Sequence, residues 1–217
     1  MNFLFLQNVS VRSQGFSPLE SSPGPNLDQV NGRLVLNGPM DGFIVPMLQR
    51  FTNISELELC SSAMSFGVFH SSPFSHLAPQ LTSLALRELW WKEDALRDVI
   101  QTPMPKLRKI YFQLLNFPDH WMKWLQRACM PALESITLEV SSYRHITPPI
   151  IQDMACSGKF PKLRTISLEY NPEFETDLEA ILFDDENIFD AFNEELLATK
   201  DKLEEKGVLL AYKFDHN

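Results

Sequence analysis

One motif occurs four times in this chain, and it constrains the fold more than any other feature. A proline is followed two residues later by leucine, and then by alternating polar and apolar residues, in the pattern P-x-L-x-x-[LI]-x-[LF]. The alternation places the two apolar residues of each L-x-L on one face of a short strand. Proline cannot continue a helix, so it should mark the entry into each strand. The four copies are APQLTSLAL (78–86), MPKLRKIYF (104–112), MPALESITL (130–138) and FPKLRTISL (160–168).

Looser copies extend the repeat toward both ends of the chain. The first leucine of L-x-L, or the isoleucine that replaces it, then recurs at positions 4, 34, 57, 84, 110, 136 and 166, in steps of 23 to 30 residues, and a last strand is expected near 208. Most of these steps fall within or near the 20–29 residues of a leucine-rich repeat. The looser copies are MNFLFL (1–6), NGRLVL (31–36), ISELEL (54–59) and GVLLAYKF (207–214).

Amphipathic helices are expected between the strands, at 92–101, 118–128 and 147–156, where apolar residues recur every three or four positions. Thr147 is the expected N-cap of the third helix. A single βα unit cannot bury its own apolar face, so the units should stack. The sequence therefore predicts an α/β leucine-rich-repeat solenoid with a curved parallel sheet on the concave side and helices on the convex side. Its predicted core is Leu84, Leu86, Ile110, Phe112, Ile136, Leu138, Ile166 and Leu168.

We expect one domain over residues 1–217, with two departures from the repeat. Residues 10–32 are rich in Ser, Pro and Gly and are predicted to form a flexible loop. Residues 172–207 are acidic and are predicted to form a helical C-terminal cap that ends at Gly207. The apolar stripe of that helix is Phe189, Phe192, Leu196, Thr199 and Leu203.

The charge distribution argues against nucleic acid as a partner. The net charge is −9, and residues 169–217 alone hold 15 acidic against 4 basic residues, so the chain offers no basic stripe for a phosphate backbone. No apolar run is long enough to span a membrane, and the start lacks the basic region of a secretory signal. Three unclustered cysteines are typical of a reducing compartment. The expected location is the cytoplasm or nucleus.

The P-x-L-x-x-L-x-L units, joined by helices with a W-x-x-L-like core such as Trp121 to Leu125, resemble the irregular leucine-rich repeats of filamentous-fungal F-box proteins over roughly residues 30–214. The resemblance implies a ribonuclease-inhibitor-like horseshoe that holds another protein as substrate for a cullin-type ubiquitin ligase. Residues 1–30 predict a strand and a loop in place of the F-box helices. A ligase adaptor is therefore an expected partner only if an F-box exists outside this chain.

No nucleotide-binding, zinc-protease or hydrolase motif occurs, and the five histidines show no metal-ligand spacing. We therefore predict no catalytic residue, no metal and no cofactor. Two alternatives stay open beside protein recognition. One is a truncated or orphan repeat protein without a ligase role, and the other is a small α/β hydrolase.

The residues that alternate with the core leucines should face the concave side and bind the partner. Arg87, Lys109 and Tyr111 lie on neighbouring predicted strands, and arginine and tyrosine are enriched among binding hot spots. We predict a basic-aromatic centre flanked by carboxylates. The predicted binding residues are Glu56, Glu58, Arg87, Lys109, Tyr111, Gln113, Glu139 and Glu169.

Overall fold

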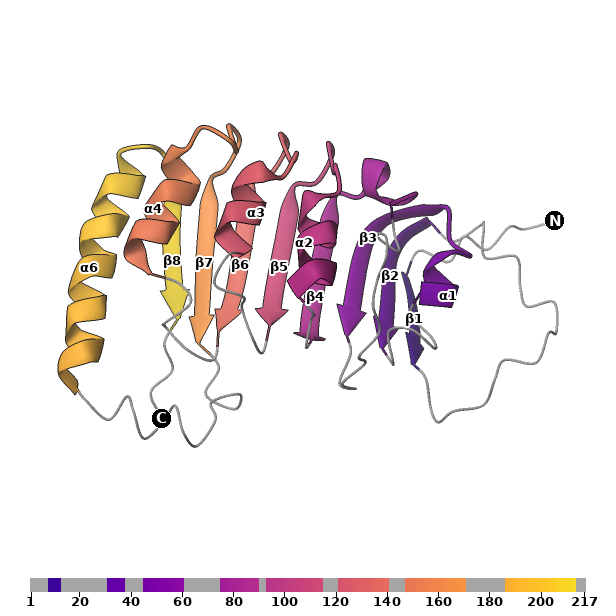
Figure 1. Ribbon diagram of the computed structural model, residues 1–217, viewed down its shortest axis with the longest axis horizontal. Helices are drawn as coiled ribbons and strands as arrows, with labels where there is room; N and C mark the ends of the chain where they lie inside the picture. The colour runs from indigo at the N-terminus through magenta and orange to yellow at the C-terminus, as the bar shows by residue number, and fades with distance from the viewer. Residues whose placement is uncertain are drawn as a thin grey trace.

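The computed structural model describes residues 8–12, 31–37, 45–60, 75–89, 93–114, 121–140, 147–170 and 186–213. Within them the chain forms a single sheet of parallel strands that follow one another in sequence order (Figure 1). Each strand pairs only with the strands of the neighbouring units, as expected of a solenoid-like α/β fold. The strands are β1 (Asn8–Arg12), β2 (Asn31–Asn37), β3 (Asn53–Cys60), β4 (Ser83–Leu89), β5 (Lys109–Leu114), β6 (Ser135–Val140), β7 (Thr165–Tyr170) and β8 (Leu209–Lys213).

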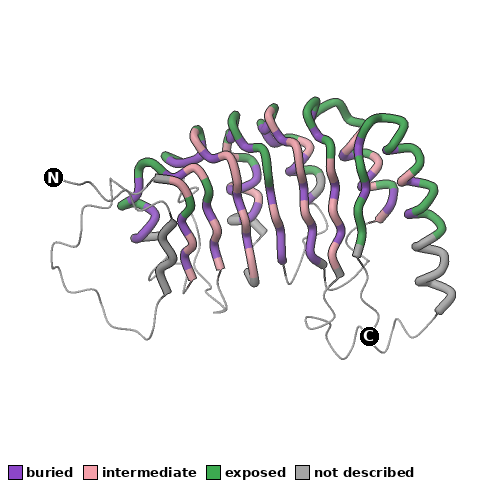
Figure 2. Tube along the Cα trace, turned by 180° about the vertical axis from the view of Figure 1, so that it is seen from behind, coloured by how far each residue is buried: buried purple, intermediate pink, exposed green. Residues whose placement is uncertain are grey.

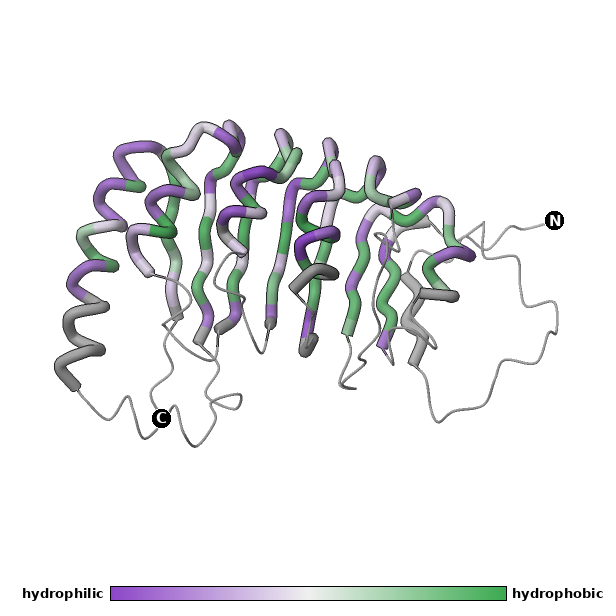
Figure 3. Tube along the Cα trace, viewed as in Figure 1, coloured by the Kyte–Doolittle hydropathy of each residue, from purple (hydrophilic) through white to green (hydrophobic). Residues whose placement is uncertain are grey.

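The described helices cover one face of the sheet, and no described helix covers the other (Figures 1 and 2). We call the bare side the open face. Seen from that side, the strands alternate between buried and partly exposed residues (Figure 2). Figure 3, viewed from the helix side, shows that hydropathy also alternates along the strands. The helical elements are α1 (Val45–Leu48), the 3-10 helix η3 (Ala78–Gln80), α2 (Glu93–Gln101), α3 (Trp121–Arg127), α4 (Pro148–Cys156) and α6 (Glu186–Glu204).

The predicted stacked core is confirmed. The strand register aligns Leu84, Ile110, Ile136 and Ile166 in one row across β4 to β7. Leu86, Phe112, Leu138 and Leu168 form the next row, and all eight side chains are at most 2% exposed. On the helix side the edge of Trp121 meets Phe112, with ring centroids 6.3 Å apart, which fixes α3 against β5.

The repeated proline has a specific backbone role. In the unit entering β5, the amide of Leu107 donates to the carbonyl of Met104 at 3.1 Å, which closes a β-turn around Pro105. Equivalent turns enclose Pro131 and Pro161. Proline suits the second position of such a turn because its fixed φ matches that position. The residue after the following leucine then bonds across to the neighbouring unit, as in Glu134 N to Arg108 O at 2.8 Å.

The N-terminal strand differs from its prediction. The structure has β1 at Asn8–Arg12, so residues 10–12 of the expected loop are in a strand, whereas the expected strand at 1–6 lies outside the described residues. Val9 pairs with Leu34 and Val11 with Leu36, so V-S-V takes the place of L-x-L. β-Branched valines at period 2 suit a strand as well as leucine does. The rest of the predicted loop, apart from residues 31 and 32 in β2, lies outside the described residues.

The last described elements of the chain are α6 and β8. Leu196, Thr199 and Leu203 of α6 are buried, and Gly207 turns the chain at φ 73° after the helix. The side chains of Phe189 and Phe192 lie outside the described set. Helix α6 packs against α4 and β8 at one end of the sheet (Figure 1).

The last strand differs slightly from its prediction. The core leucine of β8 is Leu210, which pairs with Ile166, two residues later than the expected position near 208. Thr147 is the N-cap residue of α4, as expected, although its side chain forms no capping hydrogen bond. Among the described residues, no helix is long and apolar enough to cross a membrane.

Candidate functional site

The open face presents three rows of side chains that run across the strands. The first row contains Glu56, Ser83, Lys109, Ser135 and Thr165. The second contains Glu58, Ala85, Tyr111, Thr137 and Ser167. The third contains Cys60, Arg87, Gln113, Glu139 and Glu169. The register thus aligns every residue that the sequence predicted for this surface, and most of these side chains are partly or fully exposed. Gln113 and Glu139 are buried.

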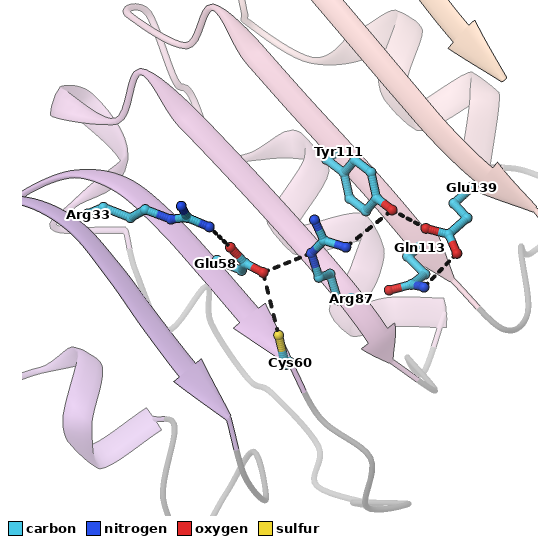
Figure 4. A network of polar contacts seen from close by, with 7 residues as sticks. All are labelled: Arg33, Glu58, Cys60, Arg87, Tyr111, Gln113 and Glu139. Atoms are coloured by element: carbon cyan, nitrogen blue, oxygen red, sulfur yellow. Dashed lines mark hydrogen bonds and ion pairs between the residues drawn. The ribbon is translucent and has the colours of Figure 1, made fainter. Parts of the chain in front are cut away.

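The second and third rows are joined by a chain of polar contacts that runs from Arg33 to Glu139 (Figure 4). Arg33, on β2, donates a hydrogen bond to Glu58 Oε2. Arg87 Nε lies 2.8 Å from Glu58 Oε1, an ion-pair contact without hydrogen-bond geometry. The thiol of Cys60 lies 3.8 Å from the same oxygen. The hydrogen bond and the charge of Glu58 raise the pKa of Arg33. Two guanidinium groups therefore share one carboxylate.

Arg87 continues the chain toward β5. Its guanidinium carbon lies 4.2 Å from the centre of the Tyr111 ring, a cation–π contact, and its Nη1 lies 3.3 Å from the Tyr111 hydroxyl. That hydroxyl donates to Glu139 Oε2, and Gln113 Nε2 donates to Glu139 Oε1 at 2.6 Å. Burial, and then the hydrogen bond to Glu139, raise the pKa of Tyr111 well above its usual value. The contacts thus cross the open face from β2 to β6 (Figure 4).

This network changes the interpretation of the predicted centre. Arg87 and Tyr111 do lie together between the two sets of carboxylates, but the charge of Arg87 is already paired with Glu58. Within the described part of the chain, Glu56, Lys109 and Glu169 form no ion pair. Of the predicted binding residues, these three therefore have a charge that is available to a partner.

A hollow of about 310 Å³ lies on the open face, over β2 to β6. Small side chains on β4 and β6, namely Ala85, Ser83 and Ser135, leave this space between the longer ones. Its lining residues are Arg33, Glu56, Leu57, Glu58, Ser83, Ala85, Arg87, Lys109, Ile110, Tyr111, Ser135 and Thr137.

Arg33 is the functional candidate that was missed in the sequence. It pairs in register with Glu56 and immediately precedes Leu34, just as Glu56 precedes Leu57. Extending the row rule to the looser copy NGRLVL would have included it. No comparable signal in the sequence predicts that its guanidinium reaches Glu58 in the next row.

The described residues contain no group of three or more His, Cys, Asp or Glu that could hold a metal ion. The His76 ring has a backbone role, because its Nε2 lies 3.1 Å from the carbonyl oxygens of both Leu48 and Phe51 after α1. His70 lies outside the described residues.

A separate ion pair joins Arg108 and Glu134 at 2.9 Å beside the β5 and β6 entry turns, and the hydrogen bond from Arg108 lowers the pKa of Glu134.

Fold and site together define an α/β protein whose parallel sheet is covered by helices on one side and carries an ordered polar surface on the other. No family model matches this chain, and no curated protein matches it.

Proposed function

We propose that this chain is a non-enzymatic recognition scaffold, a leucine-rich-repeat arc that binds another protein on its open, concave face. The observation that carries the proposal is the hollowed polar surface on a face that no described helix covers. Parallel sheets are ordinarily covered on both faces. A bare parallel face lined with charged and aromatic side chains is therefore suited to a macromolecular partner.

The polar network supports recognition more than catalysis. Its ion pairs and hydrogen bonds join side chains of five neighbouring strands, β2 to β6, which holds the side chains in fixed positions before a partner arrives. A surface that is ordered in advance loses less conformational entropy on binding. A hydrolase would instead need a nucleophile activated by a base and an oriented acid.

A narrower proposal follows from the repeat motif, which resembles that of fungal F-box proteins. Under this narrower proposal the chain is part of a substrate receptor, and its open face binds the protein that a ubiquitin ligase modifies. The test is to purify the product of the complete gene from its host and measure whether a cullin-ligase adaptor copurifies. Absence of the adaptor would favour a repeat protein without a ligase role.

The recognition proposal is tested by comparing partners captured from the native host with three forms of the chain. Ser135→Arg fills the hollow, whereas Gln101→Arg adds the same side chain at the exposed end of α2. We expect the wild type and Gln101→Arg to recover the same partners, and Ser135→Arg to lose them while keeping its circular-dichroism spectrum and melting temperature. Identical recovery by all three folded proteins would contradict the proposal.

A further inference from the structure

The first row of the open face contains three hydrogen-bond donors side by side. Ser83, Lys109 and Ser135 are direct register partners on β4, β5 and β6. Neighbouring strands lie about 4.8 Å apart, so the backbone positions of Ser83 and Ser135 lie about 10 Å apart with Lys109 between them. All three side chains line the hollow.

Among the described residues, these three donor groups have no hydrogen-bond or ion-pair partner within the chain. Lys109 is exposed, and within the described ranges it forms no ion pair, while the hydroxyls of Ser83 and Ser135 form no hydrogen bond there. Arg33 and Arg87 line the same hollow, but both are paired with Glu58. Lys109 is therefore the cation of this hollow that still lacks a carboxylate partner.

The surrounding charges limit what an anionic ligand can be. Glu56 belongs to the same row as Lys109 and lies two strands away, about 10 Å across the sheet. Glu139 and Glu169 follow on the other side, on β6 and β7. These carboxylates repel a doubly charged phosphate more strongly than a singly charged carboxylate, whose charge the ammonium of Lys109 can pair. Glu56 in turn is complementary to a basic side chain.

We propose that the segment bound on the open face is a mixed-charge protein segment that places an aspartate or glutamate on Lys109, between Ser83 and Ser135, and a basic residue against Glu56. This inference rests on the proposed recognition function and specifies its partner. Other polar side chains of the hollow are held in place by their mutual contacts, and the ammonium of Lys109 attracts the acidic residue of the segment. The residues held in this way are Arg33, Glu58, Arg87 and Tyr111.

The test uses a random peptide library displayed on phage and selected on the purified chain. Peptides selected by the wild type should carry an acidic residue at a fixed position and lose binding to Ser135→Arg. Lys109→Glu should select basic residues at that position instead. The matched control is Lys123→Glu, which makes the same charge change at an exposed position of α3 and should select the wild-type sequences.

Synthetic versions of a selected peptide then identify the anion by fluorescence polarisation. Replacing its acidic residue by asparagine or glutamine should weaken binding by about tenfold, because a charge-assisted contact with Lys109 is lost. Tighter binding of a phosphoserine version would overturn the carboxylate assignment.

The two proposals fail in different ways. Peptides that depend on the open face but show no acidic preference would overturn the inference and leave the recognition function standing. Recovery of no peptide that is sensitive to Ser135→Arg would overturn both.

Discussion

Truncation of Ile136 tests the stacked core most directly. This side chain is fully buried on β6, between Ile110 on β5 and Ile166 on β7. Ile136→Ala removes three carbon atoms, which at about 0.8 kcal/mol per buried methylene gives about 2.4 kcal/mol. A cavity that the neighbouring strands cannot close raises the cost, so the expected loss is about 2–5 kcal/mol of unfolding free energy.

The assay is urea denaturation followed by circular dichroism, with Thr137→Ala as the matched control. Thr137 is the next residue on the same strand, but it faces the open side and is only partly buried, so its truncation should cost less than about 1 kcal/mol. An unchanged midpoint for Ile136→Ala, or equal shifts for the two variants, would refute the assignment of the two faces.

Double variants extend the test to the architecture. Ile136 and Ile166 are direct register partners, so their truncations should couple by at least about 0.5 kcal/mol. Leu57 lies three strands away, at about 14 Å, and its truncation should add independently to that of Ile136. Equal coupling in both pairs would argue against nearest-neighbour stacking.

Three further predictions concern the network and the chain end. Glu58→Gln leaves Arg87 without its carboxylate and should cost about 1–3 kcal/mol in urea denaturation, whereas Glu134→Gln on the exposed pair should cost less; the reverse order would contradict the network. Because the pKa of Tyr111 is raised in the folded state, unfolding free energy should fall as pH rises above about 10, and Tyr111→Phe should remove that component; equal pH profiles for the two proteins would refute it. Deletion of 172–217 removes α6 and β8 and should cause aggregation in light scattering, so a monodisperse monomer after deletion would count against the packing at that end.

The stacked core could be predicted because its signal is local and repeated. Each L-x-L copy indicates which residues share a face of the sheet, and the proline indicates where the strand begins. The register across β4 to β7 therefore follows from aligning the copies. The first strand could not be predicted in this way. Val9 and Val11 replace both strand leucines, leucine stands at position 4 where the motif has proline, and the serine-rich sequence that follows resembles a loop. The strand conformation of this segment depends on its pairing with β2, which is a tertiary interaction.

The rows of the candidate site were predictable for the same reason, but the pairing within them was not. A row position fixes where a side chain starts, whereas the long side chains of Arg33 and Arg87 can reach several neighbours. Arg33 starts in the first row and reaches Glu58 in the second, and Arg87 reaches from the third row to the same carboxylate. Such diagonal contacts depend on rotamers and on the space around each side chain, which a strand pattern does not encode.

This pairing decides which residues can recognise a partner. From the sequence, Arg87, Lys109 and Tyr111 are equivalent members of one centre, and replacing all three by alanine is a natural test. In the folded chain, loss of Arg87 or Tyr111 would also release Glu58 or Glu139 and disturb the surface itself. Lys109 can be changed without breaking any ion pair among the described residues. A loss of binding in a Lys109 variant therefore reports on recognition, whereas the same loss in an Arg87 variant reports on recognition and surface order together.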